Sequence, residues 1–257
     1  MTNTRNYGLI ITQPEQEDWV LGSSNLPSYA THEVLEPTGQ WDKWLVAKEI
    51  QALFGVEPSS CASHGTLNAG IEILIKRKYG LETNYSDRWL AWNSGTTTQG
   101  NSPHKVAEYL RKAGVPLQSE WPVTPDVNTF DKYYEAPPAS LIPKARKLIE
   151  TYDFKHYYVP GTVEAMKDAL RFSTLGCSVS AWAQKDGIYY QFGTDNHWIV
   201  IYGWDDDKKA WKVFDSYEDS FKLYSFDSHP AIVKGYYLGK ATVRTWDFSS
   251  LFGFFKK

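Results

Sequence analysis

A cysteine stands at the start of an apolar helical pattern. Cys61 precedes Leu67 and Ile71, which recur at helical spacing and continue as an apolar stripe. In the first turn of a helix, unpaired backbone amides and the helix dipole favour a thiolate, the nucleophilic form of cysteine. The pattern therefore predicts a cysteine nucleophile at Cys61, with the hydroxyls of Ser59 and Ser60 capping the helix.

His197 is the candidate base for this nucleophile. It opens an apolar strand over residues 197–202, so its ring can be anchored at a strand end and still face a cleft. Asp215 closes the next hydrophobic strand, and a charged turn at residues 205–209 separates the two. If these strands form a hairpin, His197 and Asp215 lie at the same end, where the carboxylate can orient the imidazole.

A second histidine and a second cysteine are not expected to take part in the chemistry. His64 lies three residues after Cys61 on the same helix, but a two-ligand fragment is weak evidence for a metal, and no metal site is expected. Cys177 leads into an apolar strand and is expected to be a packed core thiol.

The elements around these residues change in character along the chain. Helices are expected over 41–54, 61–79, 86–92, 102–114, 144–152 and 163–172, and short strands over 178–182, 188–190, 197–202, 211–215, 221–224 and 235–238. Helices followed by strands predict an α+β protein with separate lobes. We expect an extended N-terminal wrap over 1–50, a helical lobe over 51–125 and a β-rich lobe over 126–257, together forming one two-lobed catalytic unit.

Composition excludes several classes of function. The 257 residues are 42% hydrophobic and 22% charged, as in globular proteins, and the net charge of −3 leaves no basic footprint for nucleic acid. The two cysteines cannot form a disulfide framework, and the apolar stretch at residues 8–11 is too short for a signal peptide or a membrane span. A reducing, cytoplasmic setting is expected, without membrane, nucleic acid or cofactor.

These motifs together resemble the papain-like cysteine peptidase family. Residues 196–204, NHWIVIYGW, are similar to the family's histidine strand with its trailing glycine, and residues 211–217, WKVFDSY, resemble its Trp-x-Val-x-Asn-Ser-Trp motif. The loop at 95–101 and the helix after it are similar to the family's glycine-bearing substrate loop. The spacing of Cys61 and His197 lies within the roughly 130–150 residues expected. The resemblance covers about residues 55–240.

The resemblance implies a fold and a set of site residues. It implies a helical lobe whose central helix carries the cysteine, facing an antiparallel β-sheet or barrel lobe that carries the histidine. It also implies a substrate side formed by the loop after the third helix and by the aromatic residue beside the base. The substrate-binding residues expected on this basis are Thr98, Gln99, Gly100, Asn101 and Trp198.

The sequence also departs from the family pattern. It has one cysteine without the following tryptophan, and Gly55 stands roughly where the family has a glutamine that helps to form the oxyanion hole. Gln51, Ser59 and Ser60 are the replacement candidates. Asp215 takes the place of the family's asparagine. If the family's double-cysteine frame is imposed, His64 falls on the nucleophile position and the protein would be inactive; we prefer Cys61.

The expected function is cysteine-dependent hydrolysis of a peptide or amide bond through a Cys61-His197-Asp215 triad and an acyl-enzyme, acting on a peptide or protein substrate. The chain as a whole, compact and without a propeptide or disulfides, resembles the divergent prokaryotic or phage-type members of the papain-like family. One alternative is a catalytically inactive papain-like scaffold that acts as a binding or virion-associated structural module. A second is a transglutaminase-like acyl transferase. Residues 1–50 lack the long charged helix of a cleavable inhibitory propeptide.

Overall fold

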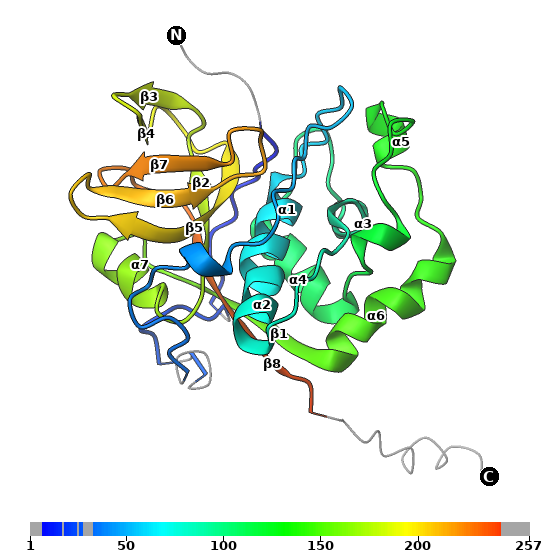
Figure 1. Ribbon diagram of the computed structural model, residues 1–257, viewed down its shortest axis with the longest axis horizontal. Helices are drawn as coiled ribbons and strands as arrows, with labels where there is room; N and C mark the ends of the chain where they lie inside the picture. The colour runs from blue at the N-terminus through cyan, green and yellow to red at the C-terminus, as the bar shows by residue number, and fades with distance from the viewer. Residues whose placement is uncertain (1–6, 17, 25, 28–32, 243–257) are drawn as a thin grey trace.

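The helix that begins at Cys61 stands between a group of helices and a large sheet (Figure 1). In the computed structural model, which describes residues 7–16, 18–24, 26–27 and 33–242, α1 (Cys61–Leu67) continues through a π-helical turn, η3 (Asn68–Glu72), into α2 (Ile73–Tyr79). Residues 61–75 are all buried, as expected of a helix enclosed on every side. Gly80 ends the helix with φ of 68°, a conformation that glycine adopts at little cost.

The helices on one side of this central helix have clear local signals. Ser86 caps α3 (Asp87–Ser94) and Ser102 caps α4 (Pro103–Ala113), because each hydroxyl accepts a backbone N–H of the first turn. The helical side also contains η4 (Gln118–Glu120), α5 (Phe130–Tyr133), η5 (Ala139–Leu141) and α6 (Ile142–Thr151). It therefore extends to residue 151, beyond the boundary at 125 expected from the sequence.

The prediction of a helix over residues 41–54 is wrong. Only a short 3-10 turn, η2 (Asp42–Trp44), forms there. Trp41 is fully buried, and its indole N–H donates to the Leu170 carbonyl at 2.7 Å. Tertiary contacts of single aromatic residues therefore hold this segment in an irregular path, although its apolar spacing resembles that of a helix.

The other side of the central helix is a mixed sheet with strand order β1-β8-β2-β5-β6-β7-β4-β3. All its pairings are antiparallel except the contact of β4 with β7. Helix α7 (Val163–Ala169) lies on this side (Figure 1). The strands are β1 (Tyr152–Tyr158), β2 (Leu175–Val179), β3 (Ala183–Lys185), β4 (Ile188–Tyr190), β5 (His197–Asp205), β6 (Ala210–Phe214), β7 (Phe221–Ser225) and β8 (Val233–Lys240). The α+β class is confirmed.

The hairpin of β5 and β6 positions the candidate base. Its strands pair antiparallel around the turn at residues 205–209, as expected, with Val200 opposite Phe214. His197 is the first residue of β5 and Asp215 directly follows β6. Both therefore lie at the end of the hairpin that faces α1.

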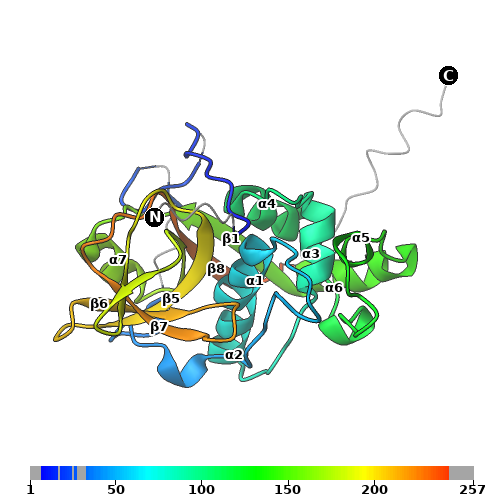
Figure 2. The same ribbon diagram turned by 90° about the horizontal axis from the view of Figure 1, so that it is seen from above.

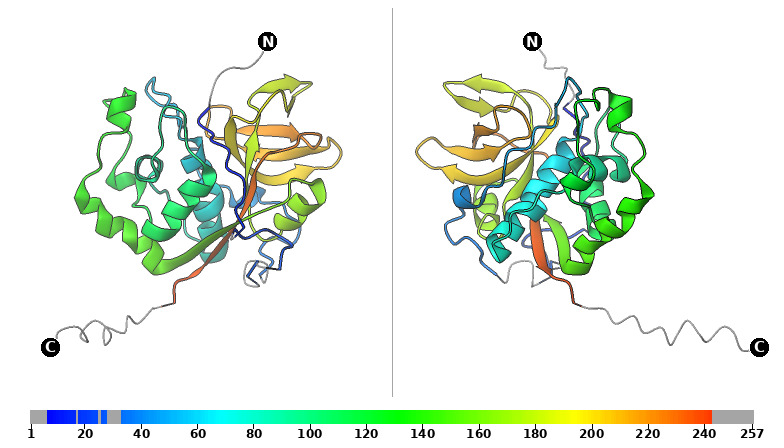
Figure 3. Two further views of the ribbon diagram at one scale, coloured as in Figure 1. Left: turned by 180° about the vertical axis from the view of Figure 1, so that it is seen from behind. Right: turned by 45° about the vertical axis from the view of Figure 1, so that its right-hand side comes forward.

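The N-terminal segment runs between the helical side and the sheet, as Figures 2 and 3 show. Its described parts pair with both sides: Leu9 forms a parallel bridge with Asn101, and Val20 forms one with Tyr158. The described parts of residues 1–50 contain these isolated bridges, several turns and the short η2. Residues 1–6, 17, 25 and 28–32 lie outside the described residues, as do 243–257 of the β-rich lobe. Within the described ranges, none of the helices has the length and apolar character needed to cross a bilayer.

Candidate active site

Cys61 is the first residue of α1 and is completely buried. The preceding serines do not cap the helix, contrary to expectation. The hydroxyl of Ser60 lies 3.2 Å from Nδ1 of His64, and that of Ser59 donates to the Thr98 carbonyl at 3.3 Å. Both hydroxyls are taken by other partners, so Cys61 begins the helix without a side-chain cap.

His197 lies between Cys61 and Asp215. Its Nε2 is 2.7 Å from Oδ1 of Asp215, and neither side chain is exposed. Burial lowers the pKa of His197, but the Asp215 carboxylate and the Cys61 sulfur outweigh burial and raise it above its ordinary value. Nδ1 makes no hydrogen bond of ordinary geometry with the described residues, so it is available for the proton of the thiol. The tertiary structure thus brings the three expected residues together.

Three aromatic rings enclose the imidazole. The rings of Tyr7 and Trp182 each lie 5.5 Å from that of His197, and the ring of Tyr217 lies 5.3 Å away. Apolar walls of this kind keep water from the His197–Asp215 bond, which strengthens its electrostatic component. Tyr7 and Trp182 were not identified from the sequence, because neither stands in a recognisable motif.

His64 faces away from the nucleophile. Its Nε2 is 3.5 Å from Oδ2 of Asp87, and its Nδ1 is within hydrogen-bond distance of Ser60. Burial lowers the pKa of His64 to about 4. A neutral imidazole held by these two residues is a packed structural group, and the part of the chain that the structure describes contains no cluster of three or more metal-binding side chains.

Gln51 is held against the loop that carries Asp215. Its Oε1 accepts the Ser216 hydroxyl at 2.9 Å, while its Nε2 donates to Glu57 and contacts the Tyr217 hydroxyl, each at 2.9 Å. The backbone N–H of Ser216 in turn donates to Oδ1 of Asp215 at 2.8 Å. Among the oxyanion candidates, Gln51 is thus linked through Ser216 to the loop that carries Asp215, and both hydrogens of its amide are engaged.

The expected substrate loop contacts the chain's own N-terminal segment. Thr98 and Gln99 are exposed, whereas Asn101 is buried. Asn101 accepts from the backbone N–H of Ile10 at 2.9 Å and donates to the carbonyl of Gly8 at 3.0 Å. Gly100 has φ of 92°, and a side chain there would collide with the Gly8 carbonyl. The segment around Gly8 therefore makes a close backbone approach at Gly100, which was expected to bind substrate.

That segment also packs against Cys61. Leu9 packs in one buried cluster with Cys61, Tyr158 and Trp198. The backbone N–H of Tyr7 donates to the Asn196 carbonyl at 3.2 Å, directly before the base. Residues 7–10 therefore lie across the site from the His197 side to the Asn101 side.

Trp198 is a packing residue in this structure. It is 1% exposed, and side chains added at Gly65 of α1 or Gly176 of β2 would collide with its indole ring. The ring fills the space between the central helix and the sheet beside Cys61. The substrate contact expected for Trp198 is not supported by this burial.

Lys222 is a site residue that sequence reasoning missed. It lies on β7, and its Nζ is 3.0 Å from Oδ2 of Asp215, with both side chains buried. The neighbouring Phe221 is 45% exposed. The strand thus inverts the usual arrangement of apolar residues inside and charged residues outside, and hydrophobic alternation therefore gives no signal for a buried Lys222.

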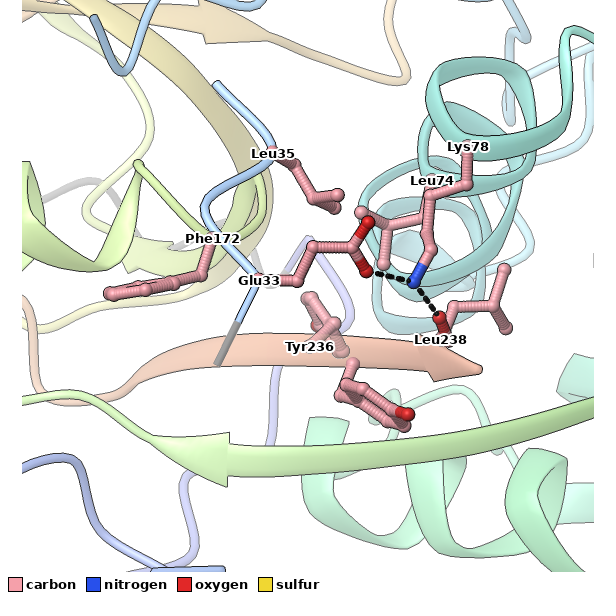
Figure 4. A pocket seen from close by; sticks show the side chains of 8 residues that line it. Glu33, Leu35, Leu74, Lys78, Phe172, Tyr236 and Leu238 are labelled. Carbon is pink, nitrogen blue, oxygen red and sulfur yellow. Dashed lines mark hydrogen bonds and ion pairs between the residues drawn. The ribbon is translucent and has the colours of Figure 1, made fainter. Parts of the chain in front are cut away.

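Among the described residues, two cavities are lined by side chains other than those of Cys61, His197 and Asp215. One of about 250 Å³ is lined by Glu49, His64, Asp87 and Tyr133, among others, and lies beside the nucleophile helix. The other, of about 10 Å³, lies between α2 and β8, where Lys78 binds Glu33 at 2.7 Å and the Leu238 carbonyl at 2.8 Å (Figure 4). The smaller cavity contains no residue of the triad and has space for about one water molecule.

Comparisons with known proteins identify fold relatives only. No protein-family model matches the sequence, and no curated protein gives a significant match. Among solved structures, the chain is similar to digestive procathepsin L 3 of Tenebrio molitor larval midgut, with a TM-score of 0.61 and 16% identity, covering 92% of this chain and 76% of that one.

Two bacterial structures are similar over most of the chain as well. Xylellain, a cysteine protease from Xylella fastidiosa, has a TM-score of 0.62 and 16% identity, covering 95% of this chain and all of that one. The cysteine protease and lectin-like domains of Cwp84, a surface layer associated protein of Clostridium difficile, have a TM-score of 0.65 and 17% identity, covering 92% of this chain and 57% of that one.

Proposed function

Since the chain has the fold of the papain-like cysteine proteases, we propose that it is a cysteine peptidase whose triad is Cys61, His197 and Asp215. The observation that carries the proposal is the position of the imidazole. Its Nε2 binds Asp215 at 2.7 Å, and the same ring interacts with Cys61 at the start of the central helix. A nucleophile, a base and a group that orients the base are the parts that acyl transfer to cysteine requires.

In the proposed reaction, the Cys61 thiol transfers its proton to Nδ1 of His197, and the sulfur attacks the carbonyl carbon of the scissile peptide bond. His197 then gives this proton to the departing amine nitrogen as the C–N bond breaks, which leaves a thioester on Cys61. Water, deprotonated by His197, attacks the thioester and releases the acid and the free thiol. Asp215 keeps the ring oriented and stabilises its cationic form.

The backbone N–H of Cys61 is the proposed donor to the oxyanion. The hydroxyls of Ser59 and Ser60 are directed to Thr98 and His64, which makes them poor second donors. Gln51 would have to exchange its bond to Glu57 or Tyr217 to reach the substrate. Loss of one oxyanion donor costs about two to three orders of magnitude in turnover, so we expect slow catalysis.

An extended peptide is the substrate class that the cleft favours. Asn101 presents one backbone N–H and one carbonyl, and the segment around Leu9 uses both. Main-chain pairing of this kind binds extended peptides with little regard to their side chains. A substrate peptide would take the place of residues 7–10 beside Asn101.

The proposal is tested by incubating the full chain with a degenerate peptide library and sequencing the products. We expect cleavage that disappears in Cys61→Ser and in His197→Ala. Cys177→Ser is the matched control, because burial keeps the pKa of this second thiol well above its ordinary value and Cys177 lies in the sheet core. Cleavage that survives Cys61→Ser would overturn the proposal. If the acyl group is instead transferred to an added amine and no hydrolysis product forms, the proposed reaction is acyl transfer and not hydrolysis.

A further inference from the structure

The carboxylate of Asp215 lies between two buried cationic groups. Its Oδ1 is 2.7 Å from Nε2 of His197, and its Oδ2 is 3.0 Å from Nζ of Lys222. One oxygen thus faces the base and the other faces the ammonium group. Each oxygen has a partner that fixes its direction, so the carboxylate plane cannot rotate without losing a charged hydrogen bond.

Lys222 is built into the sheet rather than reaching in from solvent. It lies opposite Val213 in the pairing of β6 with β7, and only 4% of its side chain is exposed. Its Nζ also donates to the Asp219 carbonyl and lies 5.1 Å from the centre of the Trp182 ring. The carboxylate of Asp219 is 3.9 Å from Nζ but is exposed, so solvent screens its charge. The loop at residues 215–220 therefore places the ammonium group behind the carboxylate, on the side away from His197.

The ammonium group of Lys222 determines the net charge of the buried site. With a thiolate on Cys61 and a proton on His197, Asp215 adds one negative charge to a buried pair that is otherwise neutral. A buried charge without a partner is costly, and it would bind the proton of His197 too tightly for efficient transfer to a leaving amine. The ammonium group of Lys222 brings the four buried groups back to a net charge of zero.

We propose that Lys222 is a positioning residue, and that the Asp215–Lys222 pair acts as one neutral group that orients His197. The inference rests on the proposed function for the meaning of the triad, while its physical content, the charge balance around His197, can be measured without turnover. The pair then does for this chain what an uncharged amide could do at the position of Asp215.

The direction of the pKa of Asp215 agrees with this arrangement. Burial raises the pKa of the carboxyl, but His197 and then Lys222 outweigh burial and hold it below its ordinary value. Asp215 is therefore ionised throughout the neutral range. Its full charge acts on His197 unless Lys222 balances it.

The test is the titration of the His197 ring in the full chain, followed by NMR of ¹⁵N-labelled histidine. In Lys222→Met the unbalanced carboxylate should raise the pKa of His197 by about one unit or more. In Asp215→Asn the unbalanced ammonium group should lower it by a similar amount. The double variant D215N/K222M removes both charges, and we expect its His197 to titrate within about half a unit of the wild-type value.

Two control variants separate charge from structure. Lys222→Arg keeps the charge and should leave the titration near wild type. Lys212→Met removes a lysine of β6 that binds Asp42 at 2.9 Å, and it should not move the pKa of His197. A merely structural role for Lys222 would change the unfolding free energy of Lys222→Met without shifting the titration, and that result would overturn the inference.

If Lys222→Met does not fold, the comparison of D215N with D215N/K222M decides the matter. Return of the His197 pKa toward wild type in the double variant supports the inference, and a double variant that titrates like D215N overturns it. Because the titration needs no substrate, a chain without peptidase activity that still shows these shifts would overturn the proposed function alone.

Discussion

Three carboxyl groups interact with one another at the central helix: Glu72 and Asp87 are buried, and Glu49 is half-buried. Burial, with the neighbouring Asp87, raises the pKa of Glu49 to about 10, and burial raises the pKa values of Glu72 and Asp87 well above their ordinary range. Glu49 and Asp87 line the cavity of about 250 Å³ together with His64. With a pKa of about 10, the Glu49 carboxyl is mostly neutral in the folded chain at pH 7 and ionised in the unfolded chain, so it reduces stability at neutral pH.

We expect the unfolding free energy of Glu49→Gln to decrease less with rising pH than that of the wild type. Because the pKa of Glu49 is raised in the folded state, its favourable contribution is complete below about pH 4.5 and is lost as the pH rises toward 10. A glutamine loses no proton. Its stability relative to wild type should therefore increase with pH, by at most about 1.4 kcal/mol per pH unit.

Urea unfolding at pH 5 and pH 8 measures this difference. The exposed Glu150→Gln on α6 is the matched control and should leave the slope of stability against pH unchanged. Equal slopes for wild type and Glu49→Gln would mean that Glu49 is ionised in the folded chain.

At the scale of elements, the contact between α1 and the sheet depends on two glycines. Gly65 of α1 and Gly176 of β2 lie on either side of the Trp198 indole, and a side chain at either position would come within 2.6 Å of it. This close packing holds the helix start, which carries Cys61, against the strand end, which carries His197. Two glycines outside the proposed triad thus allow Cys61 and His197 to lie close together.

We expect Gly65→Ala to destabilise the folded chain and to slow the peptide cleavage proposed for Cys61. In a helix, alanine is ordinarily more stabilising than glycine by roughly 0.5–1 kcal/mol. Here the added methyl would lie 2.6 Å from Cδ1 of Trp198, and overpacking of this kind costs about 1–3 kcal/mol. A decrease in the unfolding free energy, measured with urea, therefore indicates that the added methyl is overpacked against Trp198. A more stable Gly65→Ala variant would show that α1 can move away from the sheet without loss.

At the scale of the whole molecule, the N-terminal segment closes the space between the helical side and the sheet. It pairs with Asn101 on one side, packs Leu9 against Cys61, and pairs again with Tyr158 through residues 19–21. Cys61 and His197 are both 0% exposed as a result of the enclosure around them. We therefore expect residues 7–10 to limit the access of reagents to the Cys61 thiol.

We expect Leu9→Asp to increase the rate at which iodoacetamide alkylates Cys61 in the full chain. Burial of a leucine side chain is worth about 1.5–3 kcal/mol, and a charge in its place cannot stay in the cluster with Trp198. Loss of this contact corresponds to an increase in rate of about tenfold or more, measured by mass spectrometry of the modified peptide.

The neighbouring Ile11→Asp is the control. Ile11 is 38% exposed, so an aspartate there should leave the segment in place and the alkylation rate near wild type. Rates that rise equally in both variants would indicate general loosening of the chain. An unchanged rate in Leu9→Asp would show that residues 7–10 do not limit access to Cys61.

Much of the secondary structure followed from local patterns. The helix at 103–113 has serine, proline and glycine at its boundaries, and the strands at 188–190, 197–205 and 221–225 are short β-branched or aromatic runs. The strand over 152–158 was missed, since it continues without a break from α6 and its lysine and histidine conceal the apolar face. The helix expected at 41–54 failed because tertiary contacts of Trp41 outweigh apolar spacing.

The sequence by itself determined the α+β class and the hairpin that places His197 and Asp215 at one end. These two follow from periodicity and turn residues, which are local properties. The choice of Cys61 as their partner stays a proposal, and it also used the order of the motifs that resemble the papain-like family. Tertiary structure alone decided that Lys222 balances Asp215, that His64 turns to Asp87 and that Leu9 covers Cys61. Those contacts join residues far apart along the chain or reverse the usual inward direction of a strand, and no local pattern encodes which distant surfaces pack together.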